Sequence, residues 1–239
     1  MKNESLKKEE FKTILGQEQV KKQLKSALLK ERNIIIVGPP GIGKTIAGLQ
    51  YLYEGYEKKQ EAGMLIQIEE FDKTLGWYAE EFGWNLGGQQ KKGKLAIFSL
   101  KPKNYEKFHP TKIEGEFLGK LKNIIQPMKI HRVVIDSITP LEVAIGDESK
   151  YRQSFYQTVE FLKKMGTTSI IISDDKNPVK DAYQQEEHIC DGVIEMKHTK
   201  DKEQKKNIRV SKMTATNITI ADYPFTIKKG QGIIVKPFL

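Results

Sequence analysis

Two spacings of apolar residues alternate along most of the chain. Continuous apolar runs are typical of strands buried on both faces of a parallel sheet, and they predict strands at 33–37, 64–70, 95–100, 132–137 and 168–173. Apolar residues three or four positions apart predict helices at 17–30, 43–58, 74–82, 115–126 and 151–165. Strands that alternate with helices predict a mostly parallel sheet with right-handed crossover connections.

The pattern changes after residue 190. Short apolar segments then follow one another without an intervening helix, joined by charged or glycine-containing turns, at 191–198, 207–213, 222–227 and 232–236. Strands in such close succession are typical of antiparallel hairpins, which we expect at the edge of the parallel sheet. No internal repeat and no long linker divides the chain, so the pattern predicts one large α/β domain.

A glycine-rich segment between the first strand and its helix carries the strongest chemical signal. Residues 38–45, GPPGIGKT, fit the nucleotide-phosphate pattern G-x-x-x-x-G-K-[ST] in full. In such a loop, backbone N–H groups and the helix dipole bind phosphate, Lys44 reaches the β- and γ-phosphates, and Thr45 binds Mg²⁺. We therefore expect ATP and Mg²⁺ as ligands. The predicted nucleotide-binding residues are Gly38, Pro39, Pro40, Gly41, Ile42, Gly43, Lys44, Thr45 and Ile46.

Acidic residues end two of the other predicted strands. Asp136 follows the apolar run RVVI, and we expect it to hold a metal-bound water beside Thr45, the alternative being a cap of the next segment. Glu69 and Glu70 end the strand MLIQIEE, and because adjacent strand residues point to opposite faces, only one can readily face the phosphates. We predict that Glu69 orients or deprotonates the attacking water, with Glu70 as the second choice. A pair of solvated strand-end acids is the alternative.

Two further pairs of residues have less specific patterns. Asp174 and Asp175 end the fifth predicted strand, at the edge where open α/β sheets bind ligands. A role in sensing the γ-phosphate and a turn at DDKNP fit them equally well. Trp77 and Trp84 are seven residues apart, so we expect both on one helical face in the core.

Composition narrows the class of protein and its partners. The chain has 239 residues, of which 38% are hydrophobic, and no apolar run approaches the length of a membrane span, so no membrane partner is expected. A charged N-terminal segment without signal features and a single cysteine, Cys190, predict a cytoplasmic location. The net charge of +9 favours anionic partners, nucleotides or nucleic acid. Short basic runs such as 200–206 fit solvated loops nearly as well.

From residue 34 to residue 239 the chain resembles the RecA-like ATPases of the KaiC and RadA-paralogue group, especially single-domain archaeal KaiC-like proteins. The resemblance implies a three-layer RecA-like P-loop fold, whose mostly parallel sheet is extended by C-terminal antiparallel hairpins. It also implies ATPase activity, a water-activating role for Glu69, and assembly into homo-oligomeric rings or filaments with nucleotide at subunit interfaces. The segments that carry it, in order, are GPPGIGKTIAGLQYLYEG, IQIEE, EFGWNL, HRVVIDSITPLE, LKKMGTTSIIIS, HICDGVIEMK, VSKMTATN, PFTI and GIIV.

The first 33 residues depart from that family and resemble an AAA+ module. The segment FKTILGQEQVKKQLKSALLKERNIIIVGPPGIGKT is similar to the opening of such a module, so residues 1–33 are predicted to form an AAA+-like helical lead before the ATPase domain at 34–239. The resemblance makes Ile14, Leu15 and Gly16 candidate contacts of the adenine base. Stapling of the first helix is an equal alternative. The chain is thus a mosaic, natural or engineered, and a chimera of two P-loop classes that only binds nucleotide is one alternative function.

Two further departures from the family bear on activity. The family carries a Lys-Met-Arg element that reaches a neighbour's γ-phosphate, and here it is Lys212-Met213-Thr214. Because an arginine finger is typically worth about 10³–10⁵ in rate, we expect slow turnover unless Lys212 or Arg209 substitutes. A nucleotide-gated module that binds single-stranded DNA or a protein partner is therefore an alternative. Residues 184–188, QQEEH, also lack the hydroxyl groups that autophosphorylating clock domains carry there, which argues against circadian phosphotransfer.

Overall fold

The computed structural model describes residues 31–68, 72–174, 185–199, 206–218 and 220–235. The predicted helix at 17–30, and nearly all of the AAA+-like lead at 1–33, lie outside these residues. Within them, no helix is both long and apolar enough to cross a lipid bilayer.

The described residues form one sheet of nine strands, in the order β3-β2-β4-β5-β1-β6-β7-β8-β9. Its strands are β1 (Asn33–Gly38), β2 (Ala62–Ile68), β3 (Leu95–Leu100), β4 (Ile130–Asp136), β5 (Thr168–Asp174), β6 (Gly192–His198), β7 (Lys206–Met213), β8 (Tyr223–Lys228) and β9 (Gly232–Val235). The first six strands in this order, from β3 to β6, pair in parallel with their neighbours. The last three, β7, β8 and β9, join the sheet by antiparallel pairing. The predicted parallel sheet with C-terminal antiparallel hairpins is confirmed.

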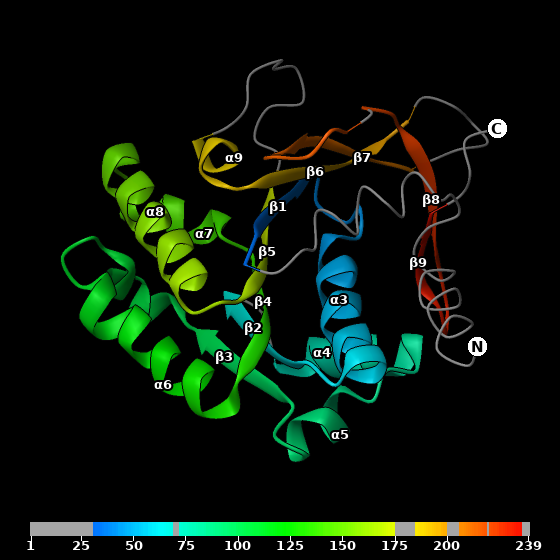
Figure 1. The fold of residues 1–239 in the computed structure, drawn as a ribbon, viewed down its shortest axis with the longest axis horizontal. Coiled ribbons are helices and arrows are strands. Elements are labelled where there is room, and N and C mark those ends of the chain that lie inside the picture. The colour runs from blue at the N-terminus through cyan, green and yellow to red at the C-terminus, as the bar shows by residue number, and fades with distance from the viewer. Residues whose placement is uncertain (1–30, 69–71, 175–184, 200–205, 219, 236–239) are drawn as a thin grey trace.

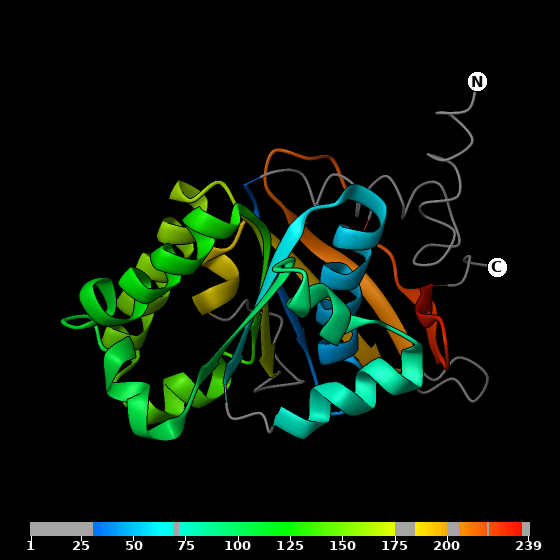
Figure 2. The ribbon, with the colours of Figure 1, turned by 90° about the horizontal axis from the view of Figure 1, so that it is seen from below.

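Helices cover both faces of the parallel strands (Figure 1). On one face lies α3 (Lys44–Lys59), and on the other lie α6 (Gly119–Met128) and α8 (Glu148–Lys164), as the turned view also shows (Figure 2). The remaining helical segments are α4 (Asp72–Phe82), α5 (Leu86–Lys91), the 3₁₀ segment η1 (Pro102–Phe108), the π-helical segment η2 (Ile113–Leu118), α7 (Thr139–Ile145) and α9 (Gln185–Ile189). The three-layer arrangement is that of the predicted α/β class.

Alternating side chains of the central strand divide the core into two halves. Ile34 and Ile36 of β1 pack in the cluster that includes Leu49 and Leu52 of α3, while Ile35 and Val37 pack in the cluster under α6 and α8. All six residues of β1 are buried, so both faces of this strand contribute to the core. A continuous apolar run is therefore the sequence signature of this strand, as expected for a parallel strand between two helical layers.

Two details differ from the sequence-based expectations. The segment at 191–198 was expected in the hairpins, but β6 pairs in parallel with β1 as well as antiparallel with β7, so it closes the parallel part of the sheet. The expected core position of Trp77 is wrong, because its side chain is 66% exposed, whereas Trp84 is buried and stacks on Phe82. Since α4 ends at Phe82, helical spacing does not carry over from Trp77 to Trp84.

Helix α3 lies close to the sheet at a glycine. A Cβ atom placed on Gly48 would lie 2.8 Å from Cγ1 of Val134 in β4 and 3.2 Å from Cδ1 of Ile172 in β5. Both of these neighbours are buried strand residues. The absence of a side chain at Gly48 thus sets how near the helix, and with it the P-loop at its N-terminus, approaches the strands.

We expect Gly48→Ala to destabilise the fold although alanine favours helices. Overpacking of a dense interior typically costs about 1–3 kcal/mol, which exceeds the roughly 0.5–1 kcal/mol that alanine gains over glycine in a helix. The free energy of unfolding, measured in urea, should therefore fall by about 1 kcal/mol.

Gly76→Ala in α4 is the matched control, because a Cβ atom there has no heavy atom within 4 Å. This change should raise the free energy of unfolding by about 0.5–1 kcal/mol. If the free energy of unfolding changed in the same direction in both variants, the close approach at Gly48 would be contradicted.

Candidate nucleotide-binding site

The phosphate loop occupies the turn between β1 and α3. Gly43 immediately precedes α3 in the left-handed conformation, with φ 119°, and Gly41 has φ 74°. A Cβ atom on Gly43 would lie 2.7 Å from Cδ1 of Ile227 in β8, and one on Gly38 would collide with the backbone carbonyl oxygen of Met196 in β6. Glycine is required here both by backbone conformation and by the closeness of β6 and β8.

Lys44 points back into this loop from the first residue of α3. Its Nζ atom donates hydrogen bonds to the carbonyl oxygens of Gly38, at 2.7 Å, and Pro39, at 3.0 Å. It also forms an ion pair with Oδ1 of Asp174, at 2.9 Å. The lysine side chain is only 6% exposed, so its ammonium group is held inside the loop where a bound phosphate would need it.

The proposed magnesium ligands come from two elements that meet at the same edge of the sheet. Thr45 lies in the first turn of α3, and Asp136 is the last, buried residue of β4. Strand β5 lies between β4 and β1, and the backbone N–H of its last residue, Asp174, donates to Oγ1 of Thr139, at 3.0 Å. A hydroxyl and a carboxylate oxygen are the hard donors that Mg²⁺ prefers, so these residues fit the ion. The glycine turn with its buried lysine fits a phosphate chain.

Other predicted residues lie outside the described part of the chain. Glu69 and Glu70 belong to this group, as do Ile14, Leu15 and Gly16. The pairing of Gln67 with Asp136 places the end of β2 beside β4 at the nucleotide edge. The roles of the two acids and of the base contacts stay predictions.

Lys212 lies away from the P-loop of its own chain. It pairs with Val193 of β6, which pairs in turn with Ile35 of β1. Because a strand rises about 3.3 Å per residue, its backbone lies about 10 Å short of Gly38 along the sheet. Its Nζ atom donates to the carbonyl oxygens at the end of α9, those of Glu187 at 2.8 Å, His188 at 3.1 Å and Cys190 at 2.9 Å.

Arg209, the other basic residue considered in place of the missing arginine, is also engaged within the chain. It donates from Nε to Oδ1 of Asp222, at 2.7 Å, and from Nη2 to Oδ2, at 2.9 Å. Partial burial raises the pKa of Asp222, but hydrogen bonds from Arg209 and Lys197 outweigh this effect and lower that pKa below its usual value. Arg209 is thus the partner of a carboxylate on the neighbouring segment.

One basic residue at the loop has no role in the sequence-based interpretation. Lys206, the first residue of β7, donates from Nζ to the carbonyl oxygen of Ile42 at 3.2 Å. It ends the basic run at 200–206, which from composition fits a solvated loop nearly as well as a contact with an anionic partner. Only the pairing of β7 with β6 brings it to the phosphate loop, so no spacing in the sequence distinguishes it from its neighbours.

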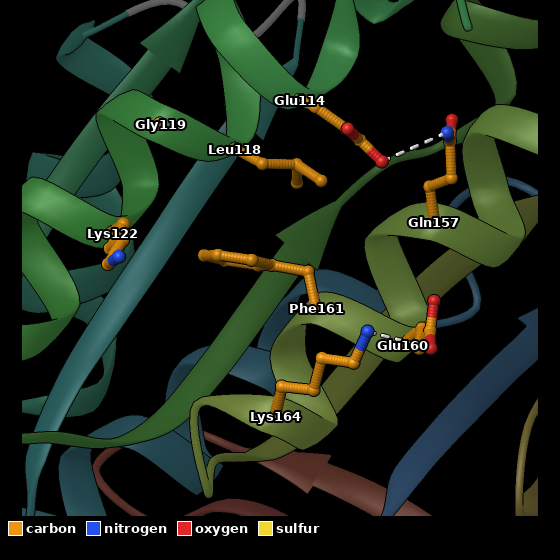
Figure 3. A pocket seen from close by; sticks show the side chains of 8 residues that line it. All are labelled: Glu114, Leu118, Gly119, Lys122, Gln157, Glu160, Phe161 and Lys164. Atoms are coloured by element: carbon orange, nitrogen blue, oxygen red, sulfur yellow. Dashed lines mark hydrogen bonds and ion pairs between the residues drawn. The ribbon is translucent and has the colours of Figure 1, made fainter.

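A separate groove of about 190 Å³ lies on the opposite face of the sheet, between α8 and the η2–α6 segment. Figure 3 shows Leu118 and Phe161 facing one another across it, with Glu160 and Lys164 paired at one side. None of the predicted site residues lines this groove. Among the described residues, no group of three or more His, Cys, Asp or Glu side chains is arranged to hold a metal ion.

Comparison with known families agrees with the geometry of the loop. A family model described as "ATPase: KaiC" matches residues 13–238. The chain belongs to the KaiC family of ATPases. This membership carries with it a RecA-like P-loop fold and, in general terms, ATP binding by an ATPase domain.

Relatives of similar length support the same assignment. A UPF0273 protein of Pyrococcus horikoshii is 32% identical, with 87% of both chains covered, and one of Thermotoga maritima is 30% identical, with 87% of this chain and 89% of the relative covered. The crystal structure of a KaiC-like protein from Pyrococcus horikoshii superimposes with a TM-score of 0.74 at 27% identity, covering 87% of this chain and 90% of that one.

Clock proteins of the family are longer. The circadian clock oscillator protein KaiC of Thermostichus vulcanus is 28% identical over 84% of this chain, but the match spans only 40% of that protein. This chain therefore corresponds to less than half of the length of that clock protein.

We expect Lys212→Ala to destabilise the isolated chain, because three carbonyl oxygens at the end of α9 lose a charged donor. Hydrogen bonds to charged groups typically contribute about 1.5–3 kcal/mol, and for this half-buried side chain we expect a loss of about 1.5 kcal/mol in the free energy of unfolding. Urea denaturation checks this value. Lys228→Ala, at the exposed end of β8, is the control and should change stability by less than about 0.5 kcal/mol.

Proposed function

We propose that the chain binds ATP with Mg²⁺ and hydrolyses it slowly, in a site that is completed by a second copy of the same chain. The observation that carries the proposal is the buried Lys44 ammonium, held inside a glycine turn whose Gly38 and Gly43 admit no side chain. The family supports ATP binding in general. Thr45 and Asp136 support the proposed magnesium requirement, and Thr214 in place of the family's arginine supports the proposed slow turnover.

Binding begins with an exchange of partners at Lys44. The ammonium group leaves the carbonyl oxygens of Gly38 and Pro39 and donates to phosphate oxygens, while loop N–H groups and the start of α3 complete the contact. Thr45 and Asp136 would hold Mg²⁺, directly or through water. The ion, when bound, would neutralise charge on the phosphates and so support transfer of the γ-phosphoryl group to water, with ADP as the leaving group.

Hydrolysis needs a residue that orients the attacking water. In our proposal Glu69 accepts the water proton through its carboxylate, with Glu70 as the second candidate. Both follow Ile68, the end of β2, which lies beside β4 and Asp136 in the sheet.

The position of Lys212, away from the loop of its own chain, supports the proposed assembly. A lysine that lies about 10 Å short of Gly38 along the sheet, bonded to α9, serves a phosphate better from the neighbouring copy than from its own. Such head-to-tail contacts close into rings or extend into filaments. Thr214 stands where the family resemblance places an arginine, which is the reason to expect a low rate.

Lys44→Ala should abolish ATP binding, because the loop then presents only neutral donors to the phosphates. Glu69→Gln should keep the affinity for ATP and lose hydrolysis by about 10²–10⁴-fold, the usual contribution of a positioned general base. Calorimetric titration and phosphate release measure the two effects separately. Unchanged binding and turnover in both variants would exclude this nucleotide site.

Mixing two inactive variants tests whether the site is shared between copies. Glu69→Gln supplies an intact Lys212, and Lys212→Ala supplies an intact Glu69. Random mixing at equal amounts makes about a quarter of head-to-tail interfaces complete, so phosphate release should recover in the mixture.

The control mixture pairs Glu69→Gln with Lys44→Ala. Lys44 and Glu69 belong to the same copy's site, so no combination of these variants restores a complete site. A mixture of Glu69→Gln with Lys212→Ala that is no more active than this control would show that Lys212 does not act across copies.

A further inference from the structure

The P-loop lysine has an acidic partner that its phosphate role does not require. Oδ1 of Asp174 lies 2.9 Å from Nζ of Lys44, and this carboxylate is 38% exposed whereas the lysine is 6% exposed. Within the described part of the chain, that ammonium group also donates to two neutral carbonyl oxygens, those of Gly38 and Pro39. A negative charge thus occupies one side of the position that a phosphate must reach.

The backbone holds this carboxylate in place. Asp174 ends β5 and pairs with Gly38 of the neighbouring β1, so it lies beside the first residue of the phosphate loop. Its N–H donates to Oγ1 of Thr139, and the N–H of Ile138 donates to the carbonyl oxygen of Ile172 at 2.9 Å. These bonds tie the end of β5 to the segment that follows Asp136. The carboxylate can turn toward solvent, but its backbone cannot withdraw without breaking them.

We propose that Asp174 makes nucleotide affinity depend on the divalent cation, by selecting against phosphates that carry no metal. This inference rests on the proposed function, since it assumes that the loop binds nucleotide. Two effects act together. The carboxylate competes with phosphate for Lys44, and once phosphate is bound the two anions repel each other at short range.

Mg²⁺ changes only the second effect. A bound divalent cation offsets the negative charge of the phosphates and so weakens their repulsion of Asp174, whereas competition for Lys44 is the same with or without the ion. Loss of the carboxylate should therefore strengthen binding of the metal-free nucleotide more than binding of the metal complex. Asp174 thereby acts as a specificity-determining residue at the edge of the site.

The test is a comparison of ADP affinity in excess Mg²⁺ and in EDTA, by calorimetric titration. ADP is the probe because it cannot be hydrolysed to release a γ-phosphate, so affinity is read without turnover. For the unmodified chain we expect binding to be weaker in EDTA. Asp174→Asn should tighten ADP binding by about tenfold in EDTA and by about threefold or less in Mg²⁺. The ratio of the dissociation constant in EDTA to that in Mg²⁺ should therefore fall.

Two control variants test whether the effect depends on a negative charge at position 174. Asp174→Glu retains the charge and should keep the ratio of the unmodified chain. Glu160→Gln removes one negative charge from the outer surface of α8, where Glu160 pairs with Lys164 at the groove, and should also leave the ratio unchanged. Circular dichroism confirms that each variant is folded.

The possible results distinguish a failure of the role of Asp174 from a failure of the proposed nucleotide binding. A folded Asp174→Asn variant with an unchanged ratio would overturn the role of Asp174, and so would weaker binding of Mg²⁺–ADP, which would make the residue a metal ligand. Equal ADP affinity of the unmodified chain and Lys44→Ala would instead overturn the proposed function, and this inference with it.

Discussion

The site depends on how closely backbone packs against backbone at the phosphate loop. Gly38 lies against the carbonyl oxygen of Met196 in β6, and Gly43 lies against the side chain of Ile227 in β8. Lys206 of β7 adds a hydrogen bond to the carbonyl oxygen of Ile42. The C-terminal strands are therefore part of the wall of the loop, and they fix its shape before any ligand enters. Glycine is needed where a side chain would open this contact.

Lys44 and Lys212, the two lysines with proposed catalytic roles, share one physical property. The ammonium group of each already has hydrogen-bond partners within the isolated chain. Lys44 bonds to loop carbonyls and Asp174, and Lys212 bonds to the end of α9. Binding to phosphate thus exchanges hydrogen bonds instead of adding them, and the net free energy is a difference between similar terms. Such a site is sensitive to small changes in charge nearby.

The sequence predicted the sheet well because buried parallel strands leave unbroken apolar runs, such as the one at Ile34 to Val37. It missed α5, α7 and α9, which have five to seven residues, too few for a helical period to repeat. The phosphate loop was predictable because its glycines and Lys44 are adjacent in the chain. The contacts of Asp174 and Lys206 with that loop were not, since they depend on which strands lie side by side. Trp77 shows the same limit, because spacing cannot tell where a helix ends.

Helix α9, the segment before the hairpins, is fixed by contacts with both α8 and β7. Glu186 and Glu187 of α9 are buried, and the Tyr151 hydroxyl of α8 donates to Oε1 of Glu186 at 2.9 Å. Burial, and then the charge of Glu186, raise the pKa of Tyr151, so this hydroxyl keeps its proton and remains a donor. The Tyr151 bond holds Glu186 of α9, while Lys212 donates to carbonyl groups at the end of the same helix. In the proposed assembly, a Lys212 side chain that turned toward a neighbouring phosphate would leave three carbonyl oxygens in need of new donors, so the proposal links assembly to the stability of α9.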